Sequence, residues 1–401
     1  MVGATFATDS AGCPPLSPAA VRPMRIVFIS GEYPPDIGGV ADYTYHLAHA
    51  LAERGHDVSV VTSTPDARYD GSGVRVHPVF DWSLSGAVGN ARVIRELNPD
   101  VINFQYVPQL YGRAGVAPGA ALLSVLLHRA GCARFVATMH EIASPLSPDP
   151  RRMVPALAHR AQALFILSAC DSAICTNPAQ ARLARQFTRG KRDVWQIPVG
   201  ASIIPEPGTD AERVALRASL GAGAHLVGEF SPLAVGKRPA DLITLARVVG
   251  PRARFLMMGG LPADAGNRAV FSRAAKLAGV AERFVWTGPS PPADVSRRLS
   301  SLDVYVHTHR GGASGRSTTL ASALAHGLPV VAYDGRETPA YLRQGGVRLV
   351  APGDVQALTR EVASLLASPA ERSRLSRNGR AFYDRELAWS VIAQRAEEAM
   401  S

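Results

Sequence analysis

The apolar residues that follow Met24 fall into short runs that alternate with stretches of helical spacing. Arg25–Ser30 (RIVFIS) is an apolar run of strand length, and Val40–Arg54 then places its apolar residues on one face of a helix. Asp57–Thr62 (DVSVVT) is the next run of strand type. Runs of the same kind recur at Val74–Val79, Val101–Phe104, Phe135–Met139, Ser172–Thr176 and Val194–Pro198. Apolar strands that alternate with helices predict a parallel sheet covered on both faces.

A second series with the same alternation fills the rest of the chain. Its predicted strands are Leu226–Phe230, Phe255–Met258, Phe284–Thr287, Val304–His307, Val330–Tyr333 and Arg348–Val350. Between the two series, the polar and alanine-rich stretch Asp210–Gly221 follows Pro205, and we expect the domain linker there. The expected fold class is therefore α/β, with two Rossmann-like, doubly wound parallel-sheet domains that face a cleft.

The chain is expected to divide into four segments. Residues 1–23 are rich in small residues and proline and lack the apolar core of a signal peptide, so they predict a disordered tail before Met24. Residues 24–205 form the first domain and residues 206–384 the second. Residues 385–401 are expected to be a C-terminal helix that packs back on the first domain.

Composition narrows the class of protein. The 401 residues are 47% hydrophobic and 19% charged, which is typical of a globular protein and argues against disorder. The four cysteines (Cys13, Cys132, Cys170 and Cys175) form no CxxC pair, which fits a reducing, cytoplasmic setting. The longest apolar stretch, Ala117–Leu127, is shorter than the roughly 18 residues of a membrane span.

Two segments of the first series follow predicted strands and are candidates for binding a ligand. Gly38 and Gly39 open a helix, where backbone N–H groups are free and a ligand can approach closely; a plain strand-to-helix turn is the alternative. His140 and Glu141 follow the strand that ends at Met139, so His140 could bind a sugar hydroxyl or a phosphate, or be a structural histidine. No further His or Cys lies at zinc-ligand spacing, so no metal is expected.

Amide and aromatic side chains lie in and just beyond another predicted strand. Asn103, Gln105 and Tyr106 belong to the stretch NFQYVPQLYG. Carbohydrate sites combine amide hydrogen bonds with aromatic faces, so this stretch suits a polyhydroxylated ligand. A polar loop with a buried tyrosine is an equally good interpretation.

The second series contains two candidate anion sites. Lys237 and Arg238 are adjacent cations after its first strand, and they could neutralise a diphosphate or simply be solvated. Gly311–Gly327 joins a glycine-rich loop to a helix, and Arg316 stands at the start of that helix. Its other candidate donors are Gly315, Ser317, Thr318 and Thr319. Helix N–H groups, hydroxyls and a guanidinium together make an anion site, although simple N-capping would explain the hydroxyls.

These segments together resemble the retaining glycosyltransferases of family 4, which have the GT-B fold. The opening, from RIVFISGEYPPDIGGVADYTYHLAHALAERGHDVSVVT, is very similar to the start of that family. Thr138–Glu141 resembles its strand–His–acid signature, and Ile197–Ile203 resembles the approach to its linker. Ala325–Ala332 and Val350–Asp354 resemble parts of its C-terminal domain.

The sequence departs from the family at the donor site. The family carries two glutamates eight positions apart around the donor helix, and this chain has Ser314 and Ser322 there. The arginine that precedes the family's lysine is also missing from GEFSPLAVGK, in which Lys237 matches the lysine and Arg238 is a possible substitute. A serine can bond a hydroxyl but carries no charge.

The resemblance implies a transfer of a sugar from a nucleoside-diphosphate sugar to an acceptor hydroxyl, with retention and without a metal or other cofactor. Catalytic roles fall on His140, Lys237 and Arg316. The donor contacts implied are Gly38, Gly39, Lys237, Arg238, Ser314, Gly315, Arg316, Ser317, Thr318, Thr319 and Ser322. The acceptor contacts expected are Asn103, Gln105, Tyr106 and Glu141, and the acceptor would be a small molecule, a glycan or a lipid-linked molecule.

Three other functions remain open at this point. A nucleotide-sugar 2-epimerase shares the fold, and a non-catalytic partner subunit would explain the serines. The net charge of +10 could suit nucleic acid, but no recognised motif accompanies it, so no nucleic-acid partner is expected. The basic cluster Arg182, Arg185, Arg189, Lys191 and Arg192 is either a solvated helix face or a contact with an anionic membrane, which would place the protein at the inner face of the membrane.

Overall fold

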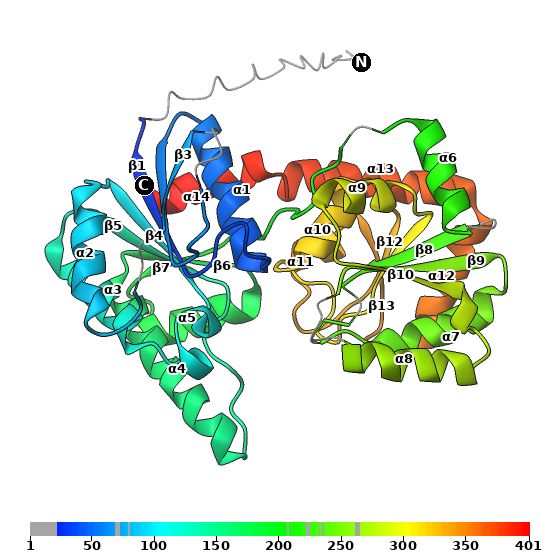
Figure 1. Cartoon of the computed structure of the whole chain (residues 1–401), viewed down its shortest axis with the longest axis horizontal. Helices are drawn as coiled ribbons and strands as arrows, with labels where there is room; N and C mark the ends of the chain where they lie inside the picture. The colour runs from blue at the N-terminus through cyan, green and yellow to red at the C-terminus, as the bar shows by residue number, and fades with distance from the viewer. Residues whose placement is uncertain are drawn as a thin grey trace, which may run out of the picture.

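The fold comes from a computed structural model that describes residues 22–68, 73–78, 81–206, 208–221, 225–231, 233–234, 236–260 and 265–401. The tail predicted for residues 1–23 lies outside the described residues except for its last two positions. Two sheets, each flanked by helices, lie side by side (Figure 1). They correspond to the two series of strands expected from the sequence.

The first sheet has seven strands in the order β3-β2-β1-β4-β5-β6-β7, and every neighbouring pair is parallel. The strands are β1 (Arg25–Ser30), β2 (Asp57–Thr62), β3 (Val74–Pro78), β4 (Val101–Tyr106), β5 (Arg134–Met139), β6 (Ser172–Cys175) and β7 (Asp193–Gln196). Parallel strands are joined by crossover connections, most of them helical. The helices among these connections are α1 (Gly39–Glu53), α2 (Gly86–Glu96), α3 (Pro118–Ala130), α4 (Pro150–Ala169) and α5 (Pro178–Thr188), with short 3-10 turns at Pro108–Leu110 and Arg113–Gly115.

Alternate residues of β1 pack into two different cores. Ile26 and Phe28 pack with α1 and the C-terminal helix α14 (Trp389–Met400). Val27 and Ile29 pack with α2, α3, α4 and α5 on the opposite face. This period of two explains why the apolar run RIVFIS is continuous, because both faces of the strand are buried. The C-terminal helix therefore belongs to the core of the first sheet.

The second sheet has six parallel strands in the order β10-β9-β8-β11-β12-β13. They are β8 (His225–Phe230), β9 (Ala253–Met258), β10 (Phe284–Gly288), β11 (Val304–His307), β12 (Val330–Tyr333) and β13 (Val347–Val350). The helices around it are α6 (Asp210–Ser219), α7 (Pro239–Val249), α8 (Ala265–Leu277), α9 (Pro292–Ser300), α10 (Thr318–Ala325), α11 (Ala340–Arg343), α12 (Val355–Ala367) and α13 (Pro369–Glu386), with a 3-10 turn at Ala281–Arg283.

The stretch Asp210–Gly221, which was expected to be the domain linker, is largely helical. The Thr209 hydroxyl accepts from the Glu212 N–H at 3.2 Å, and Glu212 accepts from the Thr209 N–H at 2.7 Å. This capping box starts α6. The chain changes cores before α6, because Val199 packs with the first sheet and Ala201 with the second.

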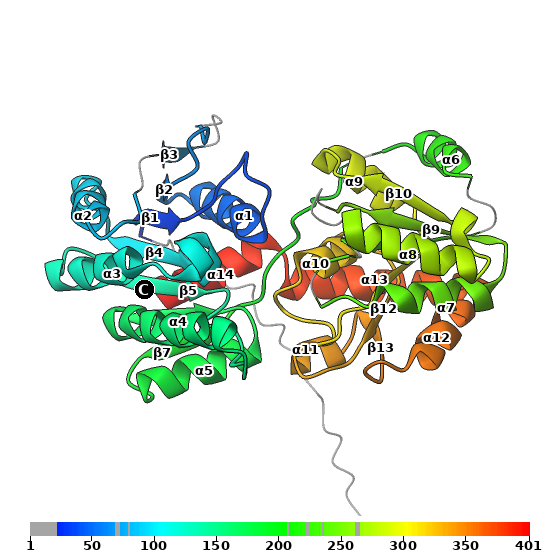
Figure 2. The same ribbon diagram turned by 60° about the horizontal axis from the view of Figure 1, so that its bottom comes forward.

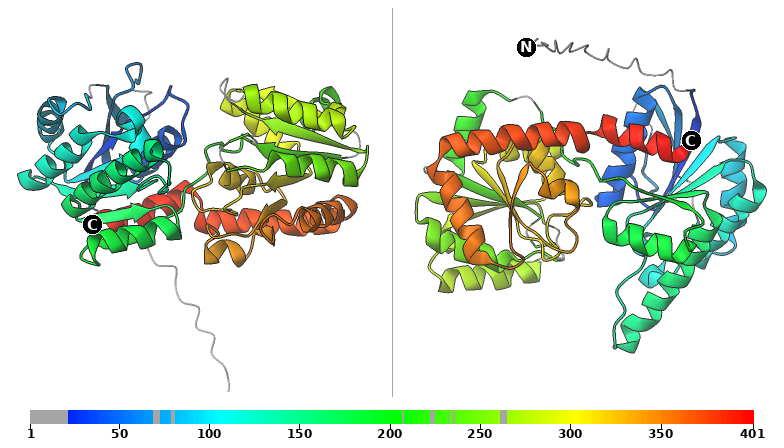
Figure 3. Two further views of the ribbon diagram at one scale, coloured as in Figure 1. Left: turned by 90° about the horizontal axis from the view of Figure 1, so that it is seen from below. Right: turned by 180° about the vertical axis from the view of Figure 1, so that it is seen from behind.

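The chain crosses between the two sheets a second time, at the junction of α13 and α14 (Figure 3). Trp389 begins α14, and its indole N–H donates to the carbonyl oxygen of Ala201 at 2.8 Å. A side chain on Gly200 would collide with the Trp389 ring. The two crossings therefore pack against each other, and the tryptophan requires the glycine.

The carboxyl ends of the two sheets meet in the region between the domains (Figure 2). The Val199 N–H, just after β7, donates to the carbonyl oxygen of Gly315 at 2.8 Å. A Cβ on Gly315 would lie 2.9 Å from the carbonyl oxygen of Thr176, just after β6. We call this region, where loops from both sheets meet, the interdomain site.

Candidate functional site

The strand order of the second sheet reverses between β8 and β11, and a buried charged cluster lies at that point. Lys237 Nζ donates to Glu229 Oε1 at 2.8 Å and contacts His307 Nδ1 at 3.0 Å. The Thr308 N–H also donates to Glu229, at 2.8 Å. Side chains of Lys237 and Glu229 are only 5% and 0% exposed. Ligands of open α/β sheets bind at such a reversal, so the cluster lies beneath the expected donor position.

The cluster keeps His307 neutral. Burial, followed by the nearby Lys237 ammonium, holds the pKa of His307 well below its ordinary value. A neutral His307 accepts from Lys237 through Nδ1. An ammonium has three N–H donors, so Glu229 and His307 leave one for a ligand. Arg238 is engaged elsewhere, because its guanidinium pairs with Asp241 at 2.6 Å.

The glycine loop before α10 is packed closely against its own domain. Side chains on Gly311 and Gly312 would collide with the segment Gly335–Thr338 that follows β12. The Ser317 hydroxyl accepts from the Leu320 N–H at 3.2 Å, so Ser317 is the N-cap of α10. The glycines therefore allow two loops to touch, and the N-capping interpretation of Ser317 is confirmed.

Arg316 and Glu337 form an ion pair at the surface of this loop. The Arg316 Nε lies 3.4 Å from Glu337 Oε2, and the side chains are 37% and 13% exposed. That Glu337 oxygen accepts no hydrogen bond from any residue that the structure describes. His309 lies close by. Burial lowers the pKa of His309, and this effect outweighs the charge of Glu337, which raises it. Arg316 is thus the accessible member of the pair at the start of α10, whereas the unbonded Glu337 oxygen is buried beneath it.

The two serines at the expected donor positions are engaged within the protein. Ser322 donates to the Thr318 carbonyl oxygen at 2.7 Å, and its hydroxyl accepts from the Ile203 N–H at 3.1 Å. Ser314 is 5% exposed, and the Arg316 N–H lies 3.4 Å from its hydroxyl. Ser322 therefore holds the interdomain segment against α10.

A chain of hydrogen bonds orients His140 at the carboxyl end of β5. The His140 Nε2–H donates to Gln105 Oε1 at 2.8 Å, and the Gln105 amide donates to Asn103 Oδ1 at 2.7 Å. Burial lowers the pKa of His140 to about 3, so its ring is neutral. With Nε2 as the donor, Nδ1 remains an acceptor. Asn103 and Gln105 are both fully buried and thus support His140 from behind.

Tyr106 faces away from this chain. Its hydroxyl accepts from the Gln162 amide at 2.9 Å, in the layer that contains α4, and the side chain is fully buried. Successive strand residues point to opposite faces, so Tyr106 cannot share the direction of Gln105. The expectation that Tyr106 contacts the acceptor is therefore wrong, because its side chain is buried on the other face of the strand. Glu141 follows His140 and is half-buried.

The helix start at Gly38 and Gly39 already binds an anion from the chain itself. Glu32 Oε1 accepts from the Val40 and Ala41 N–H groups at 3.0 and 2.9 Å. A side chain on Gly38 would collide with that carboxylate, whereas Gly39 has open space around it. Two of the donors expected for a ligand are therefore used by Glu32.

Family matches cover most of both domains. Residues 37–202 match Glycosyltransferase Family 4, and residues 227–382 match Glycosyl transferases group 1. The chain belongs to the family 4 glycosyltransferases. It is an enzyme that uses a nucleotide sugar, so the family expected from the sequence is confirmed, as is the fold.

Several relatives of this glycosyltransferase are similar over most of their length. It is 27% identical over 84% of both chains to the 2-deoxystreptamine N-acetyl-D-glucosaminyltransferase of Streptomyces fradiae. It is 25% identical, over 94% of this chain and 98% of the relative, to the GDP-mannose-dependent alpha-(1-6)-phosphatidylinositol monomannoside mannosyltransferase of Mycolicibacterium smegmatis. The crystal structure of Anabaena HepE in complex with UDP and glucose has a TM-score of 0.71 and 17% identity, over 94% and 98% of the two chains.

Sequence reasoning missed four acidic or histidine side chains of the glycosyltransferase. They are Glu32, Glu229, His307 and Glu337. Glu229 offered a signal, because it is a charged residue inside the apolar strand LVGEF. Buried carboxylates need a partner, and Lys237 was the cation nearest in sequence.

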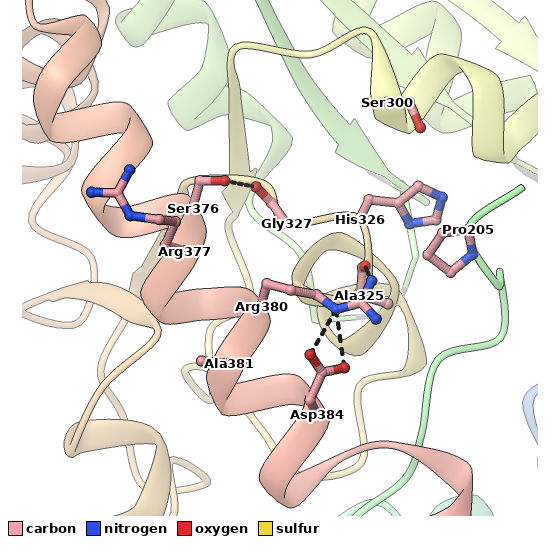
Figure 4. A pocket seen from close by; sticks show the side chains of 10 residues that line it. All are labelled: Pro205, Ser300, Ala325, His326, Gly327, Ser376, Arg377, Arg380, Ala381 and Asp384. Carbon is pink, nitrogen blue, oxygen red and sulfur yellow. Dashed lines mark hydrogen bonds and ion pairs between the residues drawn. The ribbon is translucent and has the colours of Figure 1, made fainter. Parts of the chain in front are cut away.

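A separate pocket lies at the opposite end of α10 (Figure 4). Its volume is about 470 Å³, and Pro205, His326 and Arg380 are among its lining residues. Arg380 donates to the Ala325 carbonyl oxygen at 2.8 Å and pairs with Asp384, so its charge is satisfied. This pocket is distinct from the interdomain site.

The described part of the chain offers neither a metal site nor a membrane-spanning helix. No group of three or more His, Cys, Asp or Glu side chains there is arranged to hold a metal ion. Within the same residues, no helix combines the length and the apolar character needed to cross a bilayer.

Proposed function

We propose that the second domain holds a nucleoside-diphosphate sugar and that the first domain presents an acceptor hydroxyl to it. The observation that carries this proposal is the Arg316–Glu337 pair at the start of α10. It lies beside Gly315, which contacts the first domain. Lys237 lies at the sheet reversal of the same domain.

Cations of the chain would hold the diphosphate. The Arg316 guanidinium is 37% exposed, and it can turn from Glu337 to a phosphate oxygen without leaving the loop. The remaining N–H of Lys237 and the backbone N–H groups in the first turn of α10 are further donors to the diphosphate. Arginine forms paired hydrogen bonds with phosphate, so Arg316 is the main contact in this proposal.

The carboxylate of Glu337 would contact the donor sugar. Ser314 and Ser322 are engaged within the protein, and neither offers a carboxylate to the donor. Glu337 has an oxygen with no hydrogen-bond donor and lies next to Arg316. When Arg316 turns to the diphosphate, Glu337 becomes free to accept from sugar hydroxyls.

The transfer step needs a hydroxyl, a leaving phosphate and a support for the sugar. The bond from the anomeric carbon to the phosphate oxygen breaks, and a bond to the acceptor oxygen forms on the same face. The acceptor proton passes to the leaving phosphate oxygen, and Arg316 and Lys237 stabilise the charge on the diphosphate. His140, neutral and held by Gln105, accepts a hydrogen bond from a sugar hydroxyl through Nδ1.

The acceptor is proposed to be polyhydroxylated. The two relatives described above act on 2-deoxystreptamine and on phosphatidylinositol monomannoside according to their names, and those names share a cyclic polyol. We propose that Glu141 and the loops after β4 and β5 hold such a ring, either free or attached to a lipid.

The proposal is tested by incubating the protein with nucleotide sugars and cyclic polyol acceptors, and measuring released nucleoside diphosphate. We expect release to depend on the acceptor, to yield a glycoside with the donor's anomeric configuration and to persist with a chelator. Nucleotide release with a free, altered sugar would indicate a 2-epimerase. No release and no nucleotide binding would indicate a non-catalytic partner subunit.

Arg316→Ala tests the phosphate contact, with Arg374→Ala as its matched control. Arg374 is also exposed and paired with a carboxylate, at 2.8 Å, but it lies on α13. Losing a charge-assisted hydrogen bond costs about 1.5–3 kcal/mol, so nucleoside-diphosphate affinity should fall roughly 10- to 150-fold in Arg316→Ala alone. Equal affinities of the two variants by calorimetry would refute the assignment.

A further inference from the structure

Helix α4 is apolar on both of its faces. Its buried face includes Ala163, Ile166 and Leu167, which pack in the first domain's core. Its outer face exposes four large apolar side chains, with exposed fractions from 48% to 67%: Val154, Leu157, Leu164 and Phe165. Their spacing places the four within one stripe along the helix.

An ordinary surface helix has a polar outer face. A helix that is apolar all round is normally buried, and a contiguous exposed apolar patch marks an interaction site. Leu146, in the segment that precedes α4, is also 55% exposed. In Figure 1 the first turns of α4 extend below the rest of the first domain. The stripe is thus open to a large partner.

Basic side chains lie at both ends of the stripe and beside it. Arg151 and Arg152 are exposed in the first turn of α4. At the other end, Arg192 donates to the Ser168 carbonyl oxygen at 2.9 Å. The exposed basic residues that accompany them on and after α5 are Arg182, Arg185, Arg189 and Lys191.

The excess positive charge is largely unneutralised. Residues 141–196 contain eight arginines and lysines against four acidic residues. Arg182, Arg189 and Lys191 form no ion pair with any residue in the described ranges, and Arg152 only approaches Asp149, at 3.9 Å. A partner for this surface must therefore be apolar at its centre and anionic around it.

We propose that the outer face of α4, flanked by α5, docks on an anionic lipid bilayer. The apolar stripe enters the boundary between headgroups and acyl chains, and the arginines contact lipid phosphates. A second copy of the chain fits less well, because both ends of the stripe are basic. Parallel or antiparallel pairing of two α4 helices would therefore bring like charges together.

The docking surface is joined directly to the interdomain site. The chain runs from His140, after β5, through residues 141–149 to the first turn of α4. Docking of α4 would therefore tether the loop that follows His140 to the lipid surface. The proposal concerns membrane binding alone, so it can hold even if the transfer reaction proposed above does not.

Co-sedimentation with vesicles tests this proposal on the full chain. One probe is a vesicle of phosphatidylcholine with about 30% phosphatidylglycerol, which gives the surface a negative potential. The other is a vesicle of phosphatidylcholine alone. We expect retention on the anionic vesicles and much less on the neutral ones, with retention falling as salt rises. No retention, or equal retention on both kinds, would overturn the proposal.

Substitutions locate the surface. Leu157→Glu with Phe165→Glu should weaken vesicle binding on the order of tenfold or more, because apolar area and electrostatics both contribute. Leu277→Glu is the control, since Leu277 is 86% exposed on α8 of the second domain. Unchanged melting temperatures and unchanged nucleotide binding would show that the double variant is folded. Retention equal to that of the control variant would refute the role of α4.

Charge reversal and oligomeric state complete the test. Arg151→Glu with Arg152→Glu should lose binding to anionic vesicles without altering the fold, since both side chains are exposed. Light scattering should find a monomer for the parent protein. A dimer that Leu157→Glu converts to a monomer would identify a second copy as the occupant and overturn the bilayer proposal.

Discussion

Replacing Lys237 with methionine should destabilise the second domain strongly. The ammonium of Lys237 is the cation bound to the Glu229 carboxylate, at 2.8 Å, and both side chains are almost completely buried. Methionine has a similar length and fills the space, but it leaves the carboxylate with only the Thr308 N–H and hydroxyl as donors. The perturbation therefore isolates the charge.

The expected cost follows from the burial of the pair. Removing one partner of a buried ion pair typically costs about 3–5 kcal/mol, because the other charge is left without compensation. For a domain of 150–250 residues, 1 kcal/mol shifts the melting temperature by roughly 2–4 °C, so the second domain should melt about 6–20 °C lower.

The assay is thermal and urea unfolding of three proteins: the parent, Lys237→Met, and Lys237→Met combined with Glu229→Gln. The double variant should recover most of the lost stability, since replacing both members of a buried pair is often nearly neutral. Nucleoside-diphosphate binding should stay weak in the double variant, because the third N–H of Lys237 is absent there too.

The result that would refute this reasoning is a Lys237→Met protein as stable as the parent. Such a result would mean that Lys237 points to solvent and does not pair with Glu229. Failure of the double variant to recover stability would instead show that the packing of the lysine stem, and not its charge, stabilises the domain.

Two further predictions concern the first domain. Burial, with a smaller contribution from Glu32, raises the pKa of Asp42 to about 6, so the free energy of unfolding falls as the pH rises from 4 to 6. In urea unfolding, Asp42→Asn should therefore be more stable than the parent by at most about 3 kcal/mol at pH 8 and equally stable at pH 4. Glu397 on α14 binds Arg54 and His56, so Glu397→Gln should weaken the packing of α14 and lower the free energy of unfolding by roughly 1–3 kcal/mol. Proteolysis near the C-terminus should then be faster than in the parent protein, and equal cleavage rates would contradict this prediction.

The strands could be predicted from the sequence because both faces of each sheet are covered. Val304–His307 and Val330–Tyr333 match the observed strands, since a run of apolar residues flanked by polar ones has few other solutions. The family resemblance rested on motifs spread over the whole chain, and the matches to both domains confirm it.

The site was harder to predict because its contacts join distant parts of the chain. Lys237 meets His307, 70 positions later, and Arg316 meets Glu337 across the turn after β12. Sequence spacing shows neither pairing, since each depends on strand order. Tyr106 is a different case, because the strand extends two residues beyond Phe104 and the alternation of side chains then turns Tyr106 inward.

The packing of Trp389 on Ala201 has a consequence for how the enzyme can move. The backbone passes between the domains at two places, and the indole hydrogen bond joins them at a single junction. Two tethers that meet at one junction allow rotation about it but resist separation or sliding of the domains. A rotation that moves Gly315 away from the first domain would break the Val199–Gly315 hydrogen bond, and loops far from the junction would travel farthest. Substrates would then enter and leave through one rotation of the domains about this junction. Because Trp389 lies at the junction, a change in its fluorescence would follow that rotation.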